Sequence, residues 1–381
     1  MTPLAAPRPP FGVAPSGGGV IGDAEAVELL RRVVATPSLS GEEGAVAALL
    51  VAAAGRGAAR AEVDAAGNAV ATWGAGPLAV TFLGHMDTVP GTIPVRVVDG
   101  VLQGRGVVDA KGSLCAALVA ATRVGPAVWE RLTFRLVGAV EEEAASSRGA
   151  RHAVASLPAP DLVIVGEPSG WERYTLGYKG RLGVTVTARR PSAHSSREEP
   201  SPAEVVLDAY AALREWVGRD NAAASEVGEA PPLFDRLQVA LLGVDSGSDG
   251  LEEWCEAHIG LRLPPRWAGA ALVAALDDLL RAAGVTASFT EACDAHRASN
   301  RSVLARAFRV AIRTFDGRPT PTLKTGTSDM NVVAPSWDVP MVAYGPGDSS
   351  LDHTPEERLP LGEYLLAVDV LERVLTELAG A

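Results

Sequence analysis

Histidine and carboxylate side chains follow short apolar segments at several points of this 381-residue chain. The histidines are His85, in the triplet His85-Met86-Asp87, and His353, at the end of a Gly-rich stretch. The carboxylates are Asp109, Glu141, Glu142, Glu143 and Glu167. Imidazole with carboxylate is the usual environment of zinc, and two divalent ions about 3.5–4 Å apart can share a carboxylate and activate water. Taken as a set, these residues predict a two-metal hydrolytic site.

Each motif also has an ordinary structural interpretation when it is taken alone. His85 and Asp87 could be a capping or surface pair, and Asp109 could be the N-cap of the helix that follows it. Three consecutive glutamates are commonly a solvated charge run. In an extended segment, however, residues i and i+2 point the same way, so Asp87 can hydrogen-bond the far nitrogen of His85 and orient it. The prediction therefore depends on the whole set.

The segments that precede these residues predict the elements that must position them. Strands are expected over residues 78–83, 132–140, 161–165 and 339–343, and a helix over 113–123. This alternation indicates an α/β fold with a largely parallel sheet, in which ligands bind outside the carboxyl ends of the strands. Near the N-terminus, residues 23–34 have helical spacing. Ser40 and Glu43 form an expected capping box that opens a second helix.

A different pattern begins at Gly177 and continues to about Glu291. The expected elements, in chain order, are strand 180–189, helix 202–217, strands 236–244 and 254–263, helix 268–283 and strand 285–290. A βαββαβ order of this kind is typical of a ferredoxin-like sandwich. We therefore expect an inserted domain over residues 177–291, a metal-binding catalytic domain over 21–176 and 292–381, and a flexible tail over 1–20.

The composition argues against several classes of protein. The net charge is −12, from 34 basic against 46 acidic residues, whereas a nucleic-acid binder needs an excess of positive charge. No apolar run has the roughly 18 residues that a membrane span needs. Three cysteines at unrelated spacings predict neither a disulfide framework nor a zinc ribbon. We expect a cytoplasmic protein that binds no nucleic acid and no membrane.

These motifs and their order resemble the M20 metallopeptidase family, which includes acetylornithine deacetylases and succinyl-diaminopimelate desuccinylases. The resemblance extends over nearly the whole chain from about Asp23, and the inserted domain corresponds to the lid or dimerisation domain of that family. It implies a homodimer with two divalent metal ions per chain, zinc as the first choice and cobalt as the alternative. The metal ligands that the resemblance implies are His85, Asp109 as the bridge, Glu143, Glu167 and His353.

The same resemblance implies the catalytic roles. Asp87 would orient His85, and Glu142 would act as the general base that takes a proton from the attacking water and delivers it to the leaving amine. The family motif is Asp-Glu-Glu where this chain has three glutamates, so Glu141 and Glu142 are the alternative pair of base and ligand. His194 resembles the lid histidine that reaches a neighbouring subunit's site to stabilise the oxyanion. Taken alone, it would be a turn histidine.

Three stretches look most like the subgroup that releases lysine or ornithine from a small acidic amino-group carrier protein, LysW. They begin at Gly138, Lys324 and Tyr344. In that subgroup the hydrolysed amide joins the carrier's C-terminal glutamate to the amino acid, which makes Lys324, Thr325 and Asn331 the expected substrate-binding residues. The alternatives are a deacylase of free acetylornithine or succinyl-diaminopimelate and, from another class, a non-catalytic binding module.

An arginine-rich segment is independently consistent with an acidic partner. Between His296 and Thr320 there are six arginines and one acidic residue, Asp316. On a helix, Arg306, Arg309 and Arg313 would share a face opposite the apolar side chains. This face is either a docking surface for an acidic carrier or an ordinary solvated helix face.

Overall fold

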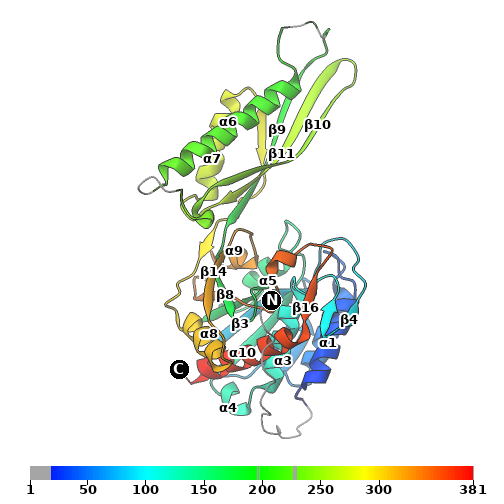
Figure 1. Cartoon of the computed structure of the whole chain (residues 1–381), viewed down its shortest axis with the longest axis vertical. Coiled ribbons are helices and arrows are strands. Elements are labelled where there is room, and N and C mark those ends of the chain that lie inside the picture. Colours follow the sequence, from blue (N-terminus) through cyan, green and yellow to red (C-terminus); the bar gives the residue numbers. More distant parts are fainter. Residues whose placement is uncertain (1–18, 195, 197, 226–229, 381) are drawn as a thin grey trace.

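The computed structural model describes residues 19–194, 196, 198–225 and 230–380. The tail predicted over residues 1–20 therefore lies almost wholly outside the described residues. The chain forms two lobes, one above the other in Figure 1. The larger lobe contains a nine-stranded sheet and a small three-stranded sheet, and the other lobe contains a four-stranded sheet. Among the described residues, none of the helices has the length and apolar character that crossing a lipid bilayer requires.

The large sheet has a parallel centre. Its strands lie in the order β1-β2-β6-β3-β7-β15-β8-β13, and β14 pairs with β8. Their bounds are β1 Arg60–Val63, β2 Ala69–Trp73, β3 Leu78–His85, β6 Leu132–Ala139, β7 Leu162–Gly166, β8 Arg173–Tyr178, β13 His296–Arg297, β14 Thr320–Lys324 and β15 Met341–Ala343. The neighbours β6, β3, β7 and β15 run parallel, which confirms the predicted fold class. Antiparallel partners flank this centre at β2 and β8.

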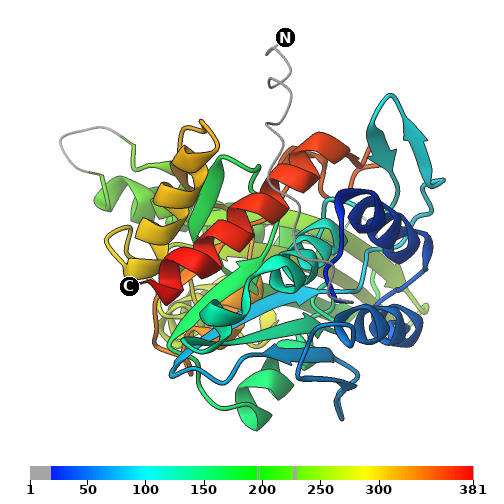
Figure 2. The same cartoon turned by 90° about the horizontal axis from the view of Figure 1, so that it is seen from below.

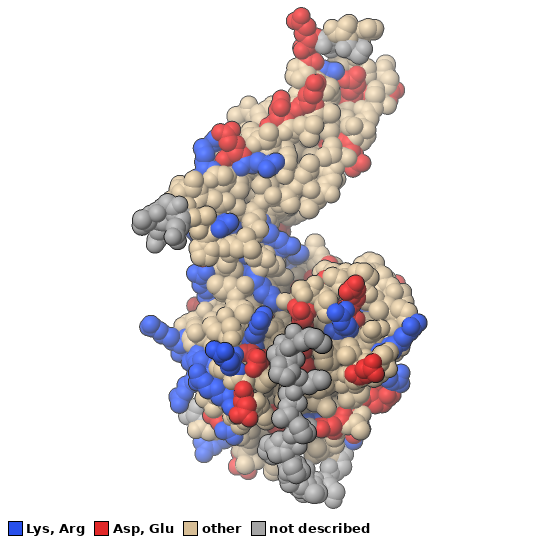
Figure 3. All heavy atoms as spheres, in the orientation of Figure 1, with Lys and Arg blue, Asp and Glu red and all other residues tan. Residues whose placement is uncertain are grey.

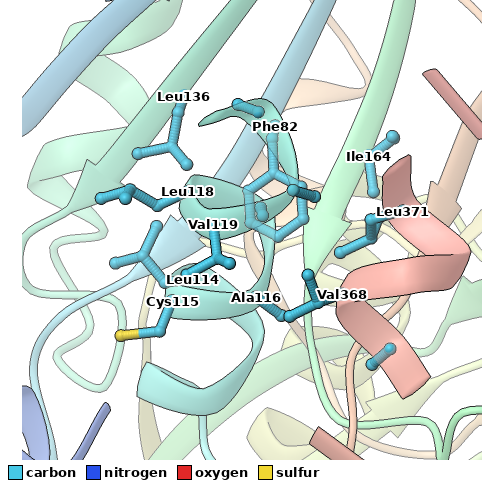
Figure 4. Packing of buried hydrophobic residues seen from close by; sticks show 14 of the residues in the cluster. Phe82, Leu114, Cys115, Ala116, Leu118, Val119, Leu136, Ile164, Val368 and Leu371 are labelled. Atoms are coloured by element: carbon cyan, nitrogen blue, oxygen red, sulfur yellow. The ribbon is translucent and has the colours of Figure 1, made fainter. Parts of the chain in front are cut away.

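Helices cover both faces of the sheet because its strands bury alternate side chains in opposite directions. Phe82 lies in one apolar core with five helices, and Leu83 lies in a second core with two shorter ones. The first group is α1 Asp23–Ala35, α2 Gly44–Ala54, α3 Lys111–Arg123, α8 Val303–Thr314 and α10 Leu361–Ala379; the second is α5 Arg148–Ser156 and α9 Asp329–Val333. Figure 2 shows α3 and α10 side by side along the sheet. In Figure 4, Leu114 and Leu118 of α3 pack against Phe82.

The capping box predicted at the start of the second helix is wrong. α2 begins at Gly44, and no side chain among the described residues caps its N-terminus. The Ser40 hydroxyl instead donates to the Asp87 carboxylate at 2.7 Å, and Glu43 accepts from the backbone N–H groups of Gly41 and Glu141. The Asp87 carboxylate is buried and cannot be hydrated, so a hydrogen bond from the Ser40 hydroxyl stabilises it strongly. A helix end in contact with water gains less from the same donor, because water can replace it.

The smaller lobe has the predicted βαββαβ order. Its elements are β9 Gly180–Pro191, α6 Pro202–Ala223, β10 Gln238–Ser248, β11 Glu252–Leu263, α7 Gly269–Ala282 and β12 Thr286–Phe289. The strands form an antiparallel sheet in the order β10-β11-β9-β12, and both helices pack on it through a separate apolar core. The ferredoxin-like arrangement is therefore confirmed. The domain boundaries at residues 177 and 291 stay a prediction.

Candidate metal centre

Three overlapping groups of potential metal ligands lie at one edge of the large sheet, and one of them is His85, Glu142 and Glu143. The other two are triads that contain Asp109: His85, Asp109 and Glu167 form one triad, and Asp109, Glu143 and His353 form the other. Within each triad the potential ligand atoms lie within 4.8 Å of one another. Asp109 belongs to both, since its Oδ1 is 3.1 Å from His85 Nε2 and its Oδ2 is 3.1 Å from His353 Nε2. Imidazole nitrogens and carboxylate oxygens in this arrangement fit two divalent ions that share one bridging carboxylate.

The parallel strands bring these side chains together. β3 ends at His85, β6 ends three residues before Glu142, and β7 ends directly before Glu167. The carboxyl ends of neighbouring parallel strands lie at the same edge of a sheet, so these residues meet although they are far apart in sequence. Asp109 comes just before α3, and His353 follows a short 3₁₀ turn over Ser349–Leu351.

Asp87 connects His85 to the segment that carries the glutamates. Its carboxylate is fully buried, lies 3.5 Å from His85 Nδ1 and accepts from the backbone N–H groups of Glu142 and Glu143 at 3.1 and 3.0 Å. Burial would raise the pKa of Asp87, but the hydrogen bonds from His85 and Ser40 hold that pKa below its usual value. Asp87 therefore stays ionised and can fix both the imidazole and the turn after β6.

The three consecutive glutamates face different surroundings. Glu141 accepts hydrogen bonds from Arg148 and Ser146 at 2.7 and 2.6 Å, on the side away from the triads. Glu143 Oε1 lies 2.8 Å from His353 Nε2. Glu142 groups with His85, and burial, reinforced by neighbouring carboxylates, raises its pKa well above the usual value. Glu142 therefore has the raised pKa that a proton-carrying carboxyl needs.

Protons and metal ions should compete for the two histidines. The Asp109 and Glu143 carboxylates raise the pKa of His353 to about 10, and Asp109 raises that of His85 although burial opposes the shift. Both imidazoles therefore hold a proton at neutral pH when no metal is bound, and a ligand imidazole must lose that proton. We expect metal affinity to increase as the pH rises towards about 10, with net release of protons.

Calorimetric titration with zinc in buffers of different ionisation enthalpy measures this release. His152, which lies 3.7 Å from Asp64 outside both triads, supplies the control. His152→Gln should leave proton release unchanged, and His353→Gln should reduce it. A metal affinity that does not vary with pH would contradict the expectation.

Glu357 holds the loop that carries Asp109, and the sequence reasoning missed it. Its buried carboxylate accepts backbone N–H groups from Val108 and Asp109 on Oε1 and from Gly106 on Oε2, at 2.9, 3.1 and 3.0 Å. Arg105 also donates to Oε2. In the sequence, Glu357 stands in a Thr-Pro-Glu-Glu stretch that is typical of an exposed turn. No local signal indicates partners about 250 residues earlier in the chain.

We expect Glu357→Gln to weaken metal binding by about 10–100-fold, the range for residues that orient a metal ligand. One carboxylate oxygen becomes an amide nitrogen that cannot accept the N–H groups facing it, so the loop with Asp109 shifts. Competition with a chelating dye measures the affinity. Glu356→Gln, at the exposed neighbouring position, is the matched control and should bind metal normally. Normal metal affinity in both variants would show that Glu357 does not position Asp109 for metal binding.

The triads border a cavity of about 1120 Å³ between the lobes. Lys324 and Thr325 line it, as expected for substrate-binding residues, and Lys324 Nζ donates to the Pro168 carbonyl beside Glu167. Asn331 does not line it. The Asn331 amide is buried and donates to the carbonyls of Tyr178 and Asp294, where the chain leaves and re-enters the larger lobe. Its position indicates support of the connections between the lobes, and its contact with substrate stays a prediction.

His194 lies away from the triads of its own chain. It is exposed in the smaller lobe, where its Nδ1 is 2.9 Å from Ser196 Oγ, and it lines a separate hollow with Arg190 and Trp254. The described residues that line the metal-side cavity do not include it. The expected role of His194 at the reacting atoms of a neighbouring subunit stays a prediction.

The arginine-rich segment forms the expected amphipathic helix, α8. Leu304, Phe308 and Ile312 are buried, whereas Arg306 and Arg313 are exposed. Figure 3 shows Lys and Arg gathered on the flank of the larger lobe around α8 and at the waist below the smaller lobe. This face is basic on a protein of net charge −12.

Comparison with known families agrees with this geometry. The model of peptidase family M20/M25/M40 matches residues 81–377. The chain belongs to this family. The resemblance read from its motifs is therefore confirmed.

Two relatives with named activities are similar to this chain. The LysW-lysine hydrolase of Deinococcus radiodurans is 50% identical over 360 residues, which cover 94% of this chain and 98% of the relative. The LysW-lysine/LysW-ornithine hydrolase of Sulfurisphaera tokodaii is 26% identical over 306 residues, which cover 78% and 81% of the two chains.

Two solved structures share the fold at low sequence identity. The M20 family metallo-carboxypeptidase Sso-CP2 from Sulfolobus solfataricus has a TM-score of 0.74 at 18% identity and covers 94% of this chain and 100% of its own. Human carnosine dipeptidase 1 has a TM-score of 0.71 at 17% identity, with 94% and 97% coverage. These likenesses support the fold and carry no information on substrate.

Proposed function

We propose that this chain is a metal-dependent amide hydrolase that releases lysine, and also ornithine, from the C-terminal glutamate of a LysW-type carrier protein. The observation that carries the reaction class is the carboxylate of Asp109, shared by two ligand triads beside Glu142 at the border of a cavity. The near-full-length relative from Deinococcus radiodurans supports the choice of substrate. The reaction belongs to lysine biosynthesis and, through ornithine, to arginine biosynthesis.

The donor set supports two divalent ions, zinc first and cobalt as the alternative. His85, Asp109 and Glu167 would hold one ion, and Asp109, Glu143 and His353 the other. When bound, such a pair polarises the amide carbonyl and makes water a stronger nucleophile at neutral pH.

The chain's own groups then move the proton. Glu142 takes it from the attacking water and gives it to the leaving amine, as its raised pKa allows. Asp87 keeps His85 in position and anchors the backbone of Glu142 and Glu143 during both transfers.

Positive charge around the cavity supports an acidic partner. Arg181 and Arg262 from the smaller lobe line the cavity opposite the triads. Burial, and then the nearby Arg181 guanidinium, lower the pKa of Arg262, so an incoming carboxylate would relieve both effects. The basic flank around α8 would favour encounter with the same acidic carrier.

We propose that the enzyme acts as a cytoplasmic homodimer, in which His194 of one subunit stabilises the oxyanion in the site of the other subunit.

Incubation with defined substrates tests this function. The metal-loaded protein is mixed with carrier-linked lysine, carrier-linked ornithine, acetylornithine or succinyl-diaminopimelate, and mass spectrometry identifies the released amino acid. We expect free lysine and ornithine from the carriers and no product from the small substrates, with all turnover abolished by chelator. Deacylation of a small substrate with intact carriers would support the alternative enzyme. Bound metal without any turnover would support a binding module.

A further inference from the structure

The hydroxyl group of Tyr178 is buried beside the metal triads without a hydrogen-bond partner. Tyr178 ends β8, is 3% exposed and lines the same cavity as Asp109, Glu142 and Glu167. No described residue lies within hydrogen-bonding distance of its Oη. Unpaired buried hydroxyls are uncommon because they lose their bonds to water without replacement. The position of this one indicates an acceptor that arrives with the substrate.

A second tyrosine on the same strand shows the contrast. Tyr174 is four residues earlier on β8, but an irregularity in the pairing of β8 with β14 lies between the two, so Tyr174 packs in the core with Phe82 and Tyr178 in the core with Leu83. Tyr174 is fully buried, but its hydroxyl donates to Asn300 Oδ1 at 2.8 Å. The Tyr174 hydroxyl is thus paired inside the protein, whereas Tyr178 lines the cavity and its hydroxyl has no partner among the described residues.

The surroundings of Tyr178 keep its hydroxyl a donor. Burial raises its pKa well above the usual value, and the carboxylates of Glu167, Asp109 and Glu142 raise that pKa further. These same carboxylates belong to both ligand triads and to the general base. Tyr178 lines the same cavity as these three carboxylates.

We propose that Tyr178 donates a hydrogen bond from its hydroxyl to the oxygen of the scissile carbonyl and stabilises the negative charge that develops there. This inference rests on the proposed amide hydrolysis. The water that Glu142 deprotonates must attack beside Glu142, and Tyr178 lines the same cavity as Glu142. A donor fixed in advance at that place acts most strongly when the oxygen becomes charged, which lowers the barrier to reaction.

Tyr178 also supplies a hydrogen-bond donor for the oxyanion from the same chain as the triads. His194, the residue that the family resemblance implies for the oxyanion, lines the other hollow and is expected to come from a second subunit. Tyr178, at the end of β8, belongs to the same chain as the triads and lines their cavity.

Tyr178→Phe in the metal-loaded enzyme tests the proposal with carrier-linked lysine. We expect kcat to fall by about 10²–10³-fold, as for loss of an oxyanion donor, with KM and metal content nearly unchanged. The thermal unfolding temperature should stay the same or rise, because the variant removes a hydroxyl that has no partner. Tyr174→Phe is the matched control. It should keep kcat and lower the unfolding temperature, because it removes one of the two hydrogen bonds that described residues donate to Asn300 Oδ1, of which only the bond from Arg309 then remains.

Three results would overturn the proposal: an unchanged kcat, a loss confined to KM, or a fall in kcat that accompanies loss of metal or of thermal stability. The first removes any catalytic role. The second would mean that the hydroxyl binds the substrate equally before and during reaction, and the third would mean that it supports the structure.

Inorganic phosphate separates this proposal from the proposed function. It is a tetrahedral anion, so its binding to the metal-loaded site requires no knowledge of the substrate. If the wild-type protein hydrolyses none of the substrates, the proposed function fails and phosphate titration decides the role of Tyr178. We expect Tyr178→Phe to bind phosphate at least about 10-fold more weakly, as for loss of a hydrogen bond to a charged group. Equal affinity would then overturn the proposal.

Discussion

Glu142→Gln is expected to keep two metal ions per chain and to lose turnover by roughly 10²–10⁴-fold, the range for a positioned general base. The amide has nearly the shape of the carboxyl group but cannot take a proton from water. The Glu142 backbone N–H would still donate to Asp87, so the turn after β6 should remain in place. Metal content by mass spectrometry and kcat with carrier-linked lysine are the two measurements.

The neighbouring glutamates supply matched controls for this variant. Glu141→Gln alters a carboxylate that pairs with Arg148 and Ser146, so it should retain metal and activity. Glu143→Gln alters the partner of His353 and should lose a metal ion. If Glu142→Gln instead loses a metal and Glu141→Gln loses turnover, the alternative assignment of base and ligand is correct.

Asp109→Asn should abolish turnover and weaken the binding of both metal ions. One negative charge between two divalent cations stabilises each of them, and the amide keeps the shape of the side chain while removing that charge. Asp109 is the one residue common to the two triads, so its loss should affect both. We expect the affinity for each metal ion to fall by more than the roughly 10–100-fold loss that follows when a residue that orients a metal ligand is replaced.

Metal content after dialysis measures this effect, together with kcat. Asp99→Asn is the control, because Asp99 is an exposed aspartate with a positive φ of 50°, a conformation that asparagine also adopts. Asp99→Asn should behave as the wild type. Retention of both ions and of turnover by Asp109→Asn would mean that another carboxylate bridges the metals.

Most of the fold followed from local sequence patterns. The apolar runs over residues 78–83 and 132–140 became β3 and β6, and the βαββαβ order of the smaller lobe was found as predicted. These patterns are reliable because the period of burial, about 2 in a strand and 3.6 in a helix, is a property of the local backbone. The capping box at Ser40 failed because its two side chains have better partners far away in sequence, at Asp87 and Glu141.

The sequence alone determined which residue types could hold metals, and that they follow strands whose carboxyl ends share an edge. It left open which of the three glutamates face the site. Glu141 has a φ of 55°, so the turn after β6 does not follow the alternation of a strand. Only the packing of that turn against Asp87 brings Glu142 and Glu143 to the triads.

The supporting residues were decided by tertiary structure. Glu357 reaches a loop about 250 residues earlier, and Asn331 joins the two connections between the lobes. Tyr178, at the cavity, has no hydroxyl partner within the described part of the chain. Hydrogen bonds of this kind depend on distances between segments that are remote in the chain, and no local period encodes them. The sequence thus determined the chemistry that is available, and the folded chain decided which groups are free to perform it.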